Sequence, residues 1–190
     1  MWLIGERAFA SKHGPSLDEH LQRWIATLEL RMSRMNAMDL DGISDRAAAE
    51  DLVQRHAIQP LEVDIGAARD GCIPVRVSAH NRFDYDMEPG DPPVPGFRVT
   101  RAFSFKGDPA LWEMKPALIV THLVRGTVKG RNFIVGADVP EEVVDEAHAH
   151  IRRCTDDLPD CLVRQADQIR SCRDEAVERL TGLIARHRAG

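Results

Sequence analysis

Hydrophobic positions in the first part of the chain recur at the spacing of an α-helix. Ser16 is a typical N-cap residue, and Glu19 stands three residues later, as in a capping box. We therefore expect a helix from Leu17 to about Met35. Its apolar face would consist of Leu17, Leu21, Trp24, Ile25, Leu28, Met32 and Met35. Ser44 begins a shorter, alanine-rich segment, which predicts a second helix ending near residue 56.

The middle of the chain changes to a period of two, which is typical of β-strands. Alternating apolar residues predict five strands, over residues 61–65, 73–79, 97–105, 117–124 and 133–135. Residues 87–96 contain four prolines and two glycines, which predicts a loop. Residues 125–131 are interpreted as a glycine-containing hairpin loop between the last two strands. We expect seven strand residues to be buried in the core: Phe97, Val99, Phe103, Phe105, Leu118, Val120 and Phe133.

Helical spacing returns after Pro140, a residue suited to the first turn of a helix. One apolar stripe covers about residues 141–157, and a second covers about residues 160–187. These stripes predict a helical hairpin or coiled segment over residues 141–190, following a domain over residues 1–140 that holds the first helices and the sheet. The elements together predict an α+β fold with two N-terminal helices, about five mostly antiparallel strands and two C-terminal helices, the last one long.

The two C-terminal helices differ in predicted length. At 1.5 Å per residue, the last helix would extend about 40 Å, and an antiparallel neighbour would cover only about 25 Å of it. The distal residues Leu180, Leu183 and Ile184 would then lack an apolar partner on that neighbour. Either the N-terminal helices cover them, or they pair between subunits, commonly in a twofold dimer. We expect the second outcome, a homo-oligomer or hetero-complex formed through residues 160–187.

Composition excludes several classes of protein. Of the 190 residues, 43% are hydrophobic and 29% are charged, as in a globular protein rather than a disordered or collagen-like one. No apolar run approaches the roughly 18 residues of a membrane span, and the N-terminus lacks the apolar stretch of a secretory signal. The four cysteines form no C-x-x-C pair: Cys72, Cys154, Cys161 and Cys172. We therefore expect a cytoplasmic protein with free thiols and no membrane partner.

Charge is distributed unevenly, although the whole chain carries −5. Residues 96–135 hold two acidic residues and seven basic ones, a net charge of +5. Such a segment either meets phosphate or an acidic partner, or is neutralised by acidic helices of the same chain, which is the simpler interpretation. The best candidates for contact with nucleic acid or a partner are Arg98, Arg101, Arg125, Lys129 and Arg131, the last three of which surround the predicted hairpin loop.

Other polar groups are weaker candidates for chemistry. His80, Asp84 and Asp86 could perform acid–base work or bind Mg²⁺, as in a small metal-dependent hydrolase, but a charged strand end has the same composition. A second group at i, i+4 spacing is either a metal ladder or a solvated helix edge: Glu142, Glu146, His150 and Cys154. No nucleophile elbow, phosphate-binding loop or metal-ligand motif occurs. We therefore expect no intrinsic catalysis, no cofactor and no metal.

Several motifs follow one another in a fixed order: Asn81-Arg-Phe-x-Tyr-Asp, Pro95-Gly-Phe-Arg-Val-Thr, Phe105-Lys-Gly-Asp-Pro-Ala-Leu-Trp-x-x-x-Pro116 and Arg125-Gly-x-Val-Lys-Gly-Arg. This series resembles the N-terminal region of a group of bacterial proteins associated with antiviral defence and restriction. In longer members an Arg-rich coiled helix and a restriction-endonuclease-like domain follow that region. The acidic and lysine residues of that nuclease have no counterpart among these 190 residues.

The resemblance implies a role in recognition, assembly or regulation rather than in cleavage. The chain would work with a protein partner encoded nearby, such as a nuclease or an ATPase. We therefore expect a non-catalytic binding and assembly module of a cytoplasmic bacterial multi-protein system. The alternative is a nucleic-acid-contacting subunit that uses the basic sheet and the hairpin loop.

Overall fold

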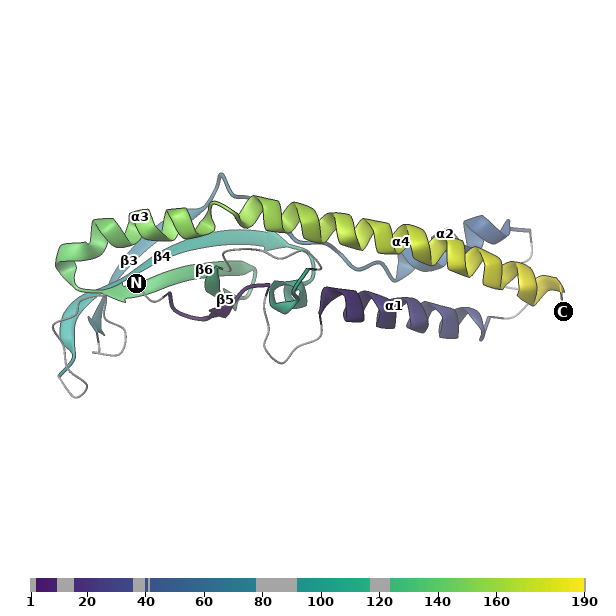
Figure 1. Cartoon of the computed structure of the whole chain (residues 1–190), viewed down its shortest axis with the longest axis horizontal. Coiled ribbons are helices and arrows are strands. Elements are labelled where there is room, and N and C mark those ends of the chain that lie inside the picture. Colours follow the sequence, from purple (N-terminus) through teal and green to yellow (C-terminus); the bar gives the residue numbers. More distant parts are fainter. Residues whose placement is uncertain are drawn as a thin grey trace.

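The computed structural model describes residues 3–9, 16–35, 40, 42–77, 92–116 and 124–189. The molecule is a rod with a sheet lobe at one end and a helical lobe at the other (Figure 1). The sheet lobe contains the β-strands and helix α3 (Val144–Thr155), and the helical lobe contains α1 (Leu17–Met32), α2 (Asp45–Arg55) and the distal part of α4 (Leu158–Ala189). The predicted α+β class, with two N-terminal helices, an antiparallel sheet and a long C-terminal helix, is confirmed.

Within the described residues the sheet has six strands, and all of its pairings are antiparallel. Their order is β1–β5–β6–β4–β2, and β3 also pairs with β4. The long strand β4 is central, because β6 lies along one of its edges and β3 and then β2 lie along the other. The bounds are β1 Glu6–Arg7, β2 Glu62–Val63, β3 Arg69–Val77, β4 Val94–Lys106, β5 Arg125–Lys129 and β6 Asn132–Val139.

The predicted proline-rich loop overlaps the start of β4, which begins at Val94 instead of after Gly96. Gly96 is not a turn residue here. A Cβ atom at this position would collide with the main chain of Val139 and the side chain of Val77. The glycine is needed because neighbouring strands approach it closely. The strand predicted over residues 117–124 lies outside the described residues except for its last position.

The predicted loop over residues 125–131 is wrong. Residues Arg125–Lys129 form strand β5, and only Gly130 and Arg131 connect it to β6. Gly130 has a φ of +58°, which suits the first position of a type II′ hairpin turn. Gly126 has a different role, because the ring of Phe133 occupies the space where its Cβ atom would lie.

One face of the sheet carries the core of its lobe. Helix α3 covers this face (Figure 1), and the 3₁₀ helix η3 (Pro109–Glu113) adds Trp112, whose ring stacks on Phe133 with centroids 4.1 Å apart. The predicted burial is confirmed for Val99, Phe103, Phe105 and Phe133. Phe97 is only partly buried, because it lies near the end of the sheet opposite the exposed Pro74. The predicted core residues Leu118 and Val120 lie outside the described residues.

Both N-terminal helices begin at the predicted caps. Ser16 and Glu19 form both bonds of a capping box at α1, and the Ser44 hydroxyl accepts a hydrogen bond from the N–H of Ala47 at α2. Helix α1 ends at Met32, three residues before the predicted end. None of the helices in the described part of the chain is long and apolar enough to cross a membrane.

The helical hairpin expected over residues 141–190 does not form. After a short 3₁₀ turn, η4 (Glu141–Val143), helices α3 and α4 continue in nearly the same direction along the rod (Figure 1). Asp156 between them keeps a right-handed helical conformation, with φ −63° and ψ −34°. Pro159 falls in the first turn of α4, where its missing N–H costs no hydrogen bond. The interruption therefore bends the helical path without reversing it.

The distal apolar residues of α4 are covered within the chain. Helix α4 packs against both α1 and α2, so that Leu180 and Ile184 are completely buried and Leu183 is partly buried. The N-terminal helices thus provide the partner that a shorter neighbouring helix would have lacked. This burial removes the basis for predicting an oligomer through these three residues.

Candidate anion-binding face of the sheet

The face of the sheet opposite α3 is the candidate functional surface, called the open face below. Because side chains alternate along a strand, it carries the residues of β4 between the buried ones, together with their cross-strand neighbours. It carries apolar side chains, among them Ile73 and Ile134, together with exposed polar or charged ones. The exposed polar or charged residues include Arg69, Ser104, Lys106, Thr127, Lys129 and Asn132.

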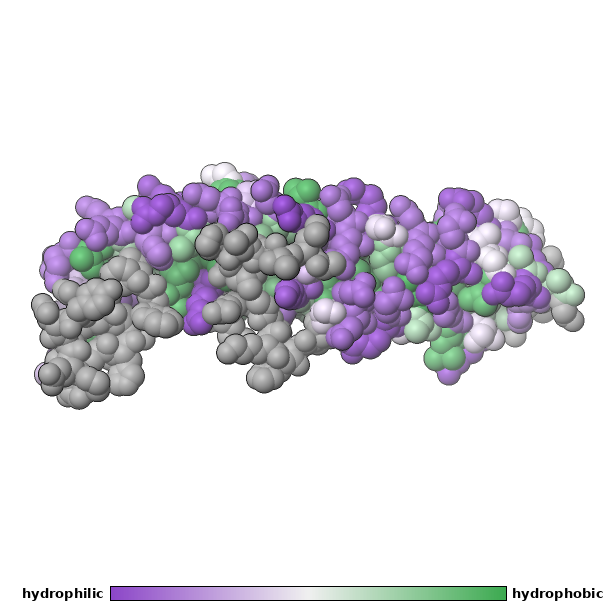
Figure 2. All heavy atoms as spheres, viewed as in Figure 1, coloured by the Kyte–Doolittle hydropathy of each residue, from purple (hydrophilic) through white to green (hydrophobic). Residues whose placement is uncertain are grey.

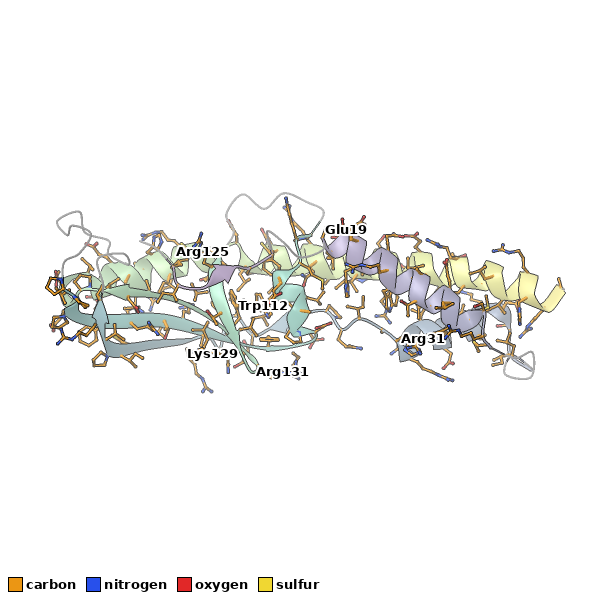
Figure 3. All side chains as sticks on the ribbon, turned by 90° about the horizontal axis from the view of Figure 1, so that it is seen from below. Glu19, Arg31, Trp112, Arg125, Lys129 and Arg131 are labelled. Atoms are coloured by element: carbon orange, nitrogen blue, oxygen red, sulfur yellow. The ribbon has the colours of Figure 1, made fainter. Side chains whose placement is uncertain are left out.

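Three cations gather where the β5–β6 hairpin ends, and we call Lys106, Lys129 and Arg131 the cationic end. Lys129 lies opposite Asn132, which lies opposite Ser104 on β4. Lys106 follows two residues later on the same face. Two strand spacings of about 4.8 Å separate β4 from β5, so the two lysines are about 10 Å apart measured perpendicular to the strands. Figure 3 shows Lys129 and Arg131 close together at the end of the hairpin.

The charges of the cationic end are not compensated by ion pairs with described residues. The ion pairs of the described part of the chain involve none of these three residues. Arg131 Nη1 donates to the carbonyl oxygen of Gly107 at 2.7 Å, which is a neutral acceptor. The guanidinium is therefore held in place while its charge stays available.

A groove of about 680 Å³ borders the cationic end. One wall is the loop over residues 56–60, which leads from α2 to β2. The other wall contains Lys106, the turn after β4 and Arg131. The groove lies between the sheet lobe and the helical lobe, and it is lined by both side chains and main-chain groups.

Hydrogen bonds to main-chain carbonyl groups hold one wall of this groove against α1 and against the other wall. The indole N–H of Trp24 on α1 donates to the carbonyl of His56 at 2.7 Å, and the N–H of Asp108 donates to the carbonyl of Gln59 at 3.0 Å. Gly107 has a φ of +95° and lies against the carbonyl of Pro60, where a side chain would not fit. The groove is therefore formed before any ligand binds.

Two of the predicted contact residues are neutralised inside the protein. Arg98 lies on the open face, but its Nε and Nη2 donate to Asp138 at 2.6 and 2.8 Å. Hydrogen bonding to Asp138 raises the pKa of Arg98. Arg101 lies on the opposite face and binds Asp70 at 3.0 Å. For these two residues the charge is neutralised within the chain, but by carboxylates on strands, Asp138 on β6 and Asp70 on β3, and not by the acidic helices that the simpler interpretation named.

Asp70 also receives Arg152 of α3, with 2.7 Å between Nη2 and Oδ2. Partial burial raises the pKa of Asp70, but the hydrogen bond from Arg152 and the charge of Arg101 outweigh it and lower the pKa overall. Asp70 thus ties α3 to the sheet. The remaining predicted contact, Arg125, lies at the far end of β5 from Lys129, beside β1 (Figure 3).

The other candidates form no centre that the structure describes. His80, Asp84 and Asp86 lie outside the described residues. Within the described part, no group of three His, Cys, Asp or Glu residues could hold a metal ion. Cys154 Sγ lies 3.3 Å from His150 Nε2, but burial lowers the pKa of His150 and raises that of Cys154. Both shifts favour the neutral form of the pair over an activated thiolate.

The remaining cysteines resemble ordinary structural residues. Cys161 and Cys172 are buried, and burial raises the pKa of Cys172 to about 11. Cys72 on β3 is exposed. The thiols that the structure describes are all free.

The sequence did not indicate that Lys106 belongs to the same site as Lys129 and Arg131. The residues are far apart in the chain, and only the register of β4, β6 and β5 brings them together. One signal was available, because Lys106 alternates with the buried Phe103 and Phe105 and must therefore face the open side. Residues 56–60 have no comparable pattern in the sequence that would place them in a groove wall.

No family model, curated protein or solved structure matches this chain. The resemblance to defence-associated proteins therefore rests on its sequence motifs.

Proposed function

We propose that this protein is a non-catalytic binding and assembly module of a bacterial multi-protein system, and that the system acts in antiviral defence. The observation that carries this proposal is the preformed groove beside Lys129 and Arg131, two exposed cations that form no ion pair with a described residue. Groups that stabilise the fold pair with each other, as Arg98 does with Asp138. Cations held without such a partner are suited to contact another molecule.

The residues lining the groove favour binding over reaction. Lys106 and Arg131 supply positive charge, and the turn after β4 supplies main-chain groups. Among the described residues that line it, none is a serine, threonine or cysteine that a neighbouring base could activate. The motif resemblance supports a partner encoded nearby, such as a nuclease or an ATPase.

The test is co-expression of the full chain with the product of each adjacent gene. We expect one product to form a stoichiometric complex, measured by size-exclusion chromatography with light scattering. The chain alone should cleave neither nucleotides nor nucleic acid. Cleavage by the chain alone that His80→Ala or Asp84→Ala abolishes would contradict the proposal, as would failure of every adjacent product to bind.

A further inference from the structure

We propose that residues 3–9, called the arm below, are exchangeable, and that the site holding them accepts the same segment of a second copy of this chain. The arm contains β1 and lies along β5, at one end of the strand order. Three features of the arm support exchange: the socket that holds it, its short pairing with the sheet and its strained backbone. The inference does not rest on the proposed function, because it concerns association of the chain with itself.

The site that holds the arm specifies its occupant. The N–H of Ala8 donates to the carbonyl of Val124 at 2.8 Å, and the N–H of Phe9 donates to the carbonyl of Trp112 at 2.6 Å. The ring of Phe9 lies against that of Trp112, with 5.4 Å between the centroids, and Phe9 is completely buried. The arm of a second copy has the same sequence and can make the same contacts, so the site fits it without any change.

The arm is held along a short stretch of the sheet. It pairs with β5 at two positions, Glu6 opposite Gly126 and Arg7 opposite Arg125, and Ile4 adds an isolated bridge to β6. A cavity of about 270 Å³ is lined by residues of both the arm and β5, so the two are not closely packed along their whole length. Few contacts must therefore break before the arm can leave, and the rest of the sheet can stay folded.

The backbone of the arm is strained in the socket. Phe9 has a φ of +56°, a conformation that a bulky residue rarely adopts. Residues 10–15 connect Phe9 to Ser16, the N-cap of α1, so the chain that leaves the socket must lead to the α1 of the same molecule. The arm of a second copy does not have to reach that helix. Exchange therefore keeps the contacts of the site and allows Phe9 to adopt a negative φ.

A vacated site would attract another strand. Without the arm, β5 would become the edge of the sheet, and an exposed edge strand is a template for pairing with another chain. The ring of Trp112 would also lose its contact with Phe9. The site is therefore filled either by its own arm or by that of a second copy, and the second outcome gains as the protein concentration rises.

The experiment detects exchange through a disulfide between two different full-length chains. One chain carries Arg7→Cys and the other carries Arg125→Cys, and both carry Cys72→Ser, which removes the exposed native thiol. Positions 7 and 125 are Cα partners. The Cα atoms of such an antiparallel pair lie about 4.5–5.5 Å apart, within the range of a disulfide. Neither chain can form this bond within itself. The chains are mixed at high concentration with oxidised glutathione and analysed by mass spectrometry.

We expect a covalent heterodimer whose disulfide joins positions 7 and 125. The matched control replaces the second chain by one carrying Ser171→Cys, an exposed position on α4. It should give at least about tenfold less heterodimer, because a disulfide forms only between suitably placed cysteines. Adding Gly5→Ala to the Arg7→Cys chain should also remove the product, because a Cβ atom there would collide with the carbonyl of Gly126. A yield no higher than the control, or a product that Gly5→Ala leaves unchanged, would overturn the inference.

A synthetic peptide of residues 1–10 provides a second measurement that does not depend on the folding of the Gly5→Ala chain. An excess of this peptide should occupy the site and reduce the yield of heterodimer, whereas the same peptide with Phe9→Ala should not. Failure of the native peptide to compete would overturn the inference. Neither measurement involves an adjacent gene product, so failure here leaves the proposed function to its own test.

Discussion

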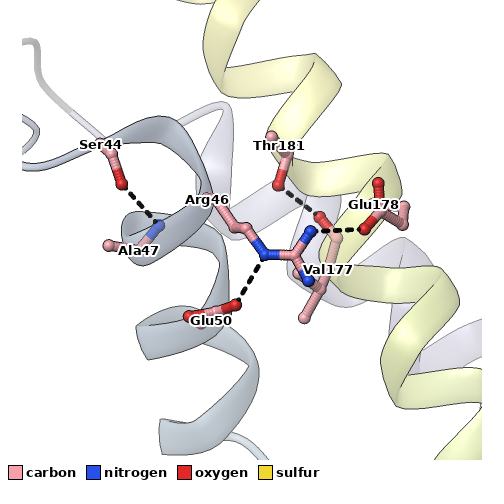
Figure 4. A network of polar contacts seen from close by, with 7 residues as sticks. All are labelled: Ser44, Arg46, Ala47, Glu50, Val177, Glu178 and Thr181. Carbon is pink, nitrogen blue, oxygen red and sulfur yellow. Dashed lines mark hydrogen bonds and ion pairs between the residues drawn. The ribbon is translucent and has the colours of Figure 1, made fainter.

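The helical lobe and the sheet lobe use their arginine and lysine side chains differently. In the helical lobe, arginines join one helix to another: Arg46 binds Glu178 at 2.9 Å and Arg179 binds Glu29 at 2.6 Å. Figure 4 shows Arg46 of α2 between Glu50 of its own helix and Glu178 of α4. At the cationic end of the sheet lobe, Arg131 donates to a main-chain carbonyl instead, and Lys129 forms no ion pair with a described residue. Ion pairs thus join elements in the helical lobe and at Asp70 and Asp138 of the sheet lobe, whereas Lys129 and Arg131 make no such ion pair with a described residue.

The two lobes also differ in their cores. Aliphatic side chains fill the helical lobe, whereas the sheet lobe has Trp112 in contact with three phenylalanine rings: Phe9, Phe105 and Phe133. In the view of Figure 2, hydrophilic side chains cover most of the helical lobe, and only scattered apolar residues reach its surface. The helical lobe thus presents no broad apolar surface in this view.

The largest expected effect tests the aromatic core of the sheet lobe. Phe103 is completely buried under α3, so Phe103→Ala should lower the free energy of unfolding by about 3–5 kcal/mol. The measurement is urea denaturation followed by circular dichroism. Ile73 on β3 is the matched control, because it is 55% exposed, and Ile73→Ala should change stability by less than about 0.5 kcal/mol. A loss below about 1 kcal/mol for Phe103→Ala would contradict the strand register.

The next effect tests the core of the helical lobe. Leu180 is completely buried between α4 and the N-terminal helices, so Leu180→Ala should cost about 2–5 kcal/mol. Val163 on the same helix is 59% exposed, and Val163→Ala should cost little. Leu180→Asp should unfold the lobe. A folded Leu180→Asp chain with a smaller mass by light scattering would instead place Leu180 in a subunit interface.

Local signals made the helical lobe easier to predict than the sheet lobe. Ser16 and Ser44 lie immediately before the helices that they cap, so the evidence and the structure are neighbours in the chain. In the sheet, Gly126 and Gly130 look alike in the sequence. One allows a phenylalanine ring to pack on a strand, and the other adopts a positive φ in a turn. The role of each glycine depends on the residues of the neighbouring strand. The groove likewise depends on residues that lie far apart in the sequence.

The direction of α4 shows a second limit of sequence reasoning. Pro159 marks an interruption in the helical pattern, and both a reversal and a bend would produce that pattern. The sheet decides between them, because α3 lies along it and leads α4 toward α1 and α2. Burial of Leu180 and Ile184 follows from that direction, and it could not be read from the apolar spacing of α4.

An intermediate effect concerns the attachment of α3 to the sheet through Asp70. The hydrogen bond from Arg152 and the charge of Arg101, which outweigh partial burial, lower the pKa of Asp70 below its ordinary value of 3.8. A carboxyl group whose pKa is lower in the folded state stabilises the protein at any pH above its unfolded-state pKa. This contribution is lost as the pH falls through the folded-state pKa. The unfolding free energy of the native chain should therefore fall more steeply below about pH 4 than that of Asp70→Asn. Parallel curves for the two proteins in that range would contradict the role given to Asp70.

The smallest effect tests the difference between the lobes directly, through Arg46 and Lys129. The hydrogen bonds that Arg46 donates to Glu50 and Glu178 raise the pKa of Arg46, but all three side chains are well exposed. Arg46→Ala should therefore cause only a small loss of stability, which should disappear at about 0.5 M salt because exposed ion pairs are screened there.

Lys129→Ala should cause no loss at any salt concentration, since Lys129 forms no ion pair with a described residue. Thermal unfolding by calorimetry measures both variants under the same conditions. If Lys129→Ala proved as destabilising as Arg46→Ala, Lys129 would be part of the internal framework of the fold, and its charge would not be available for a partner.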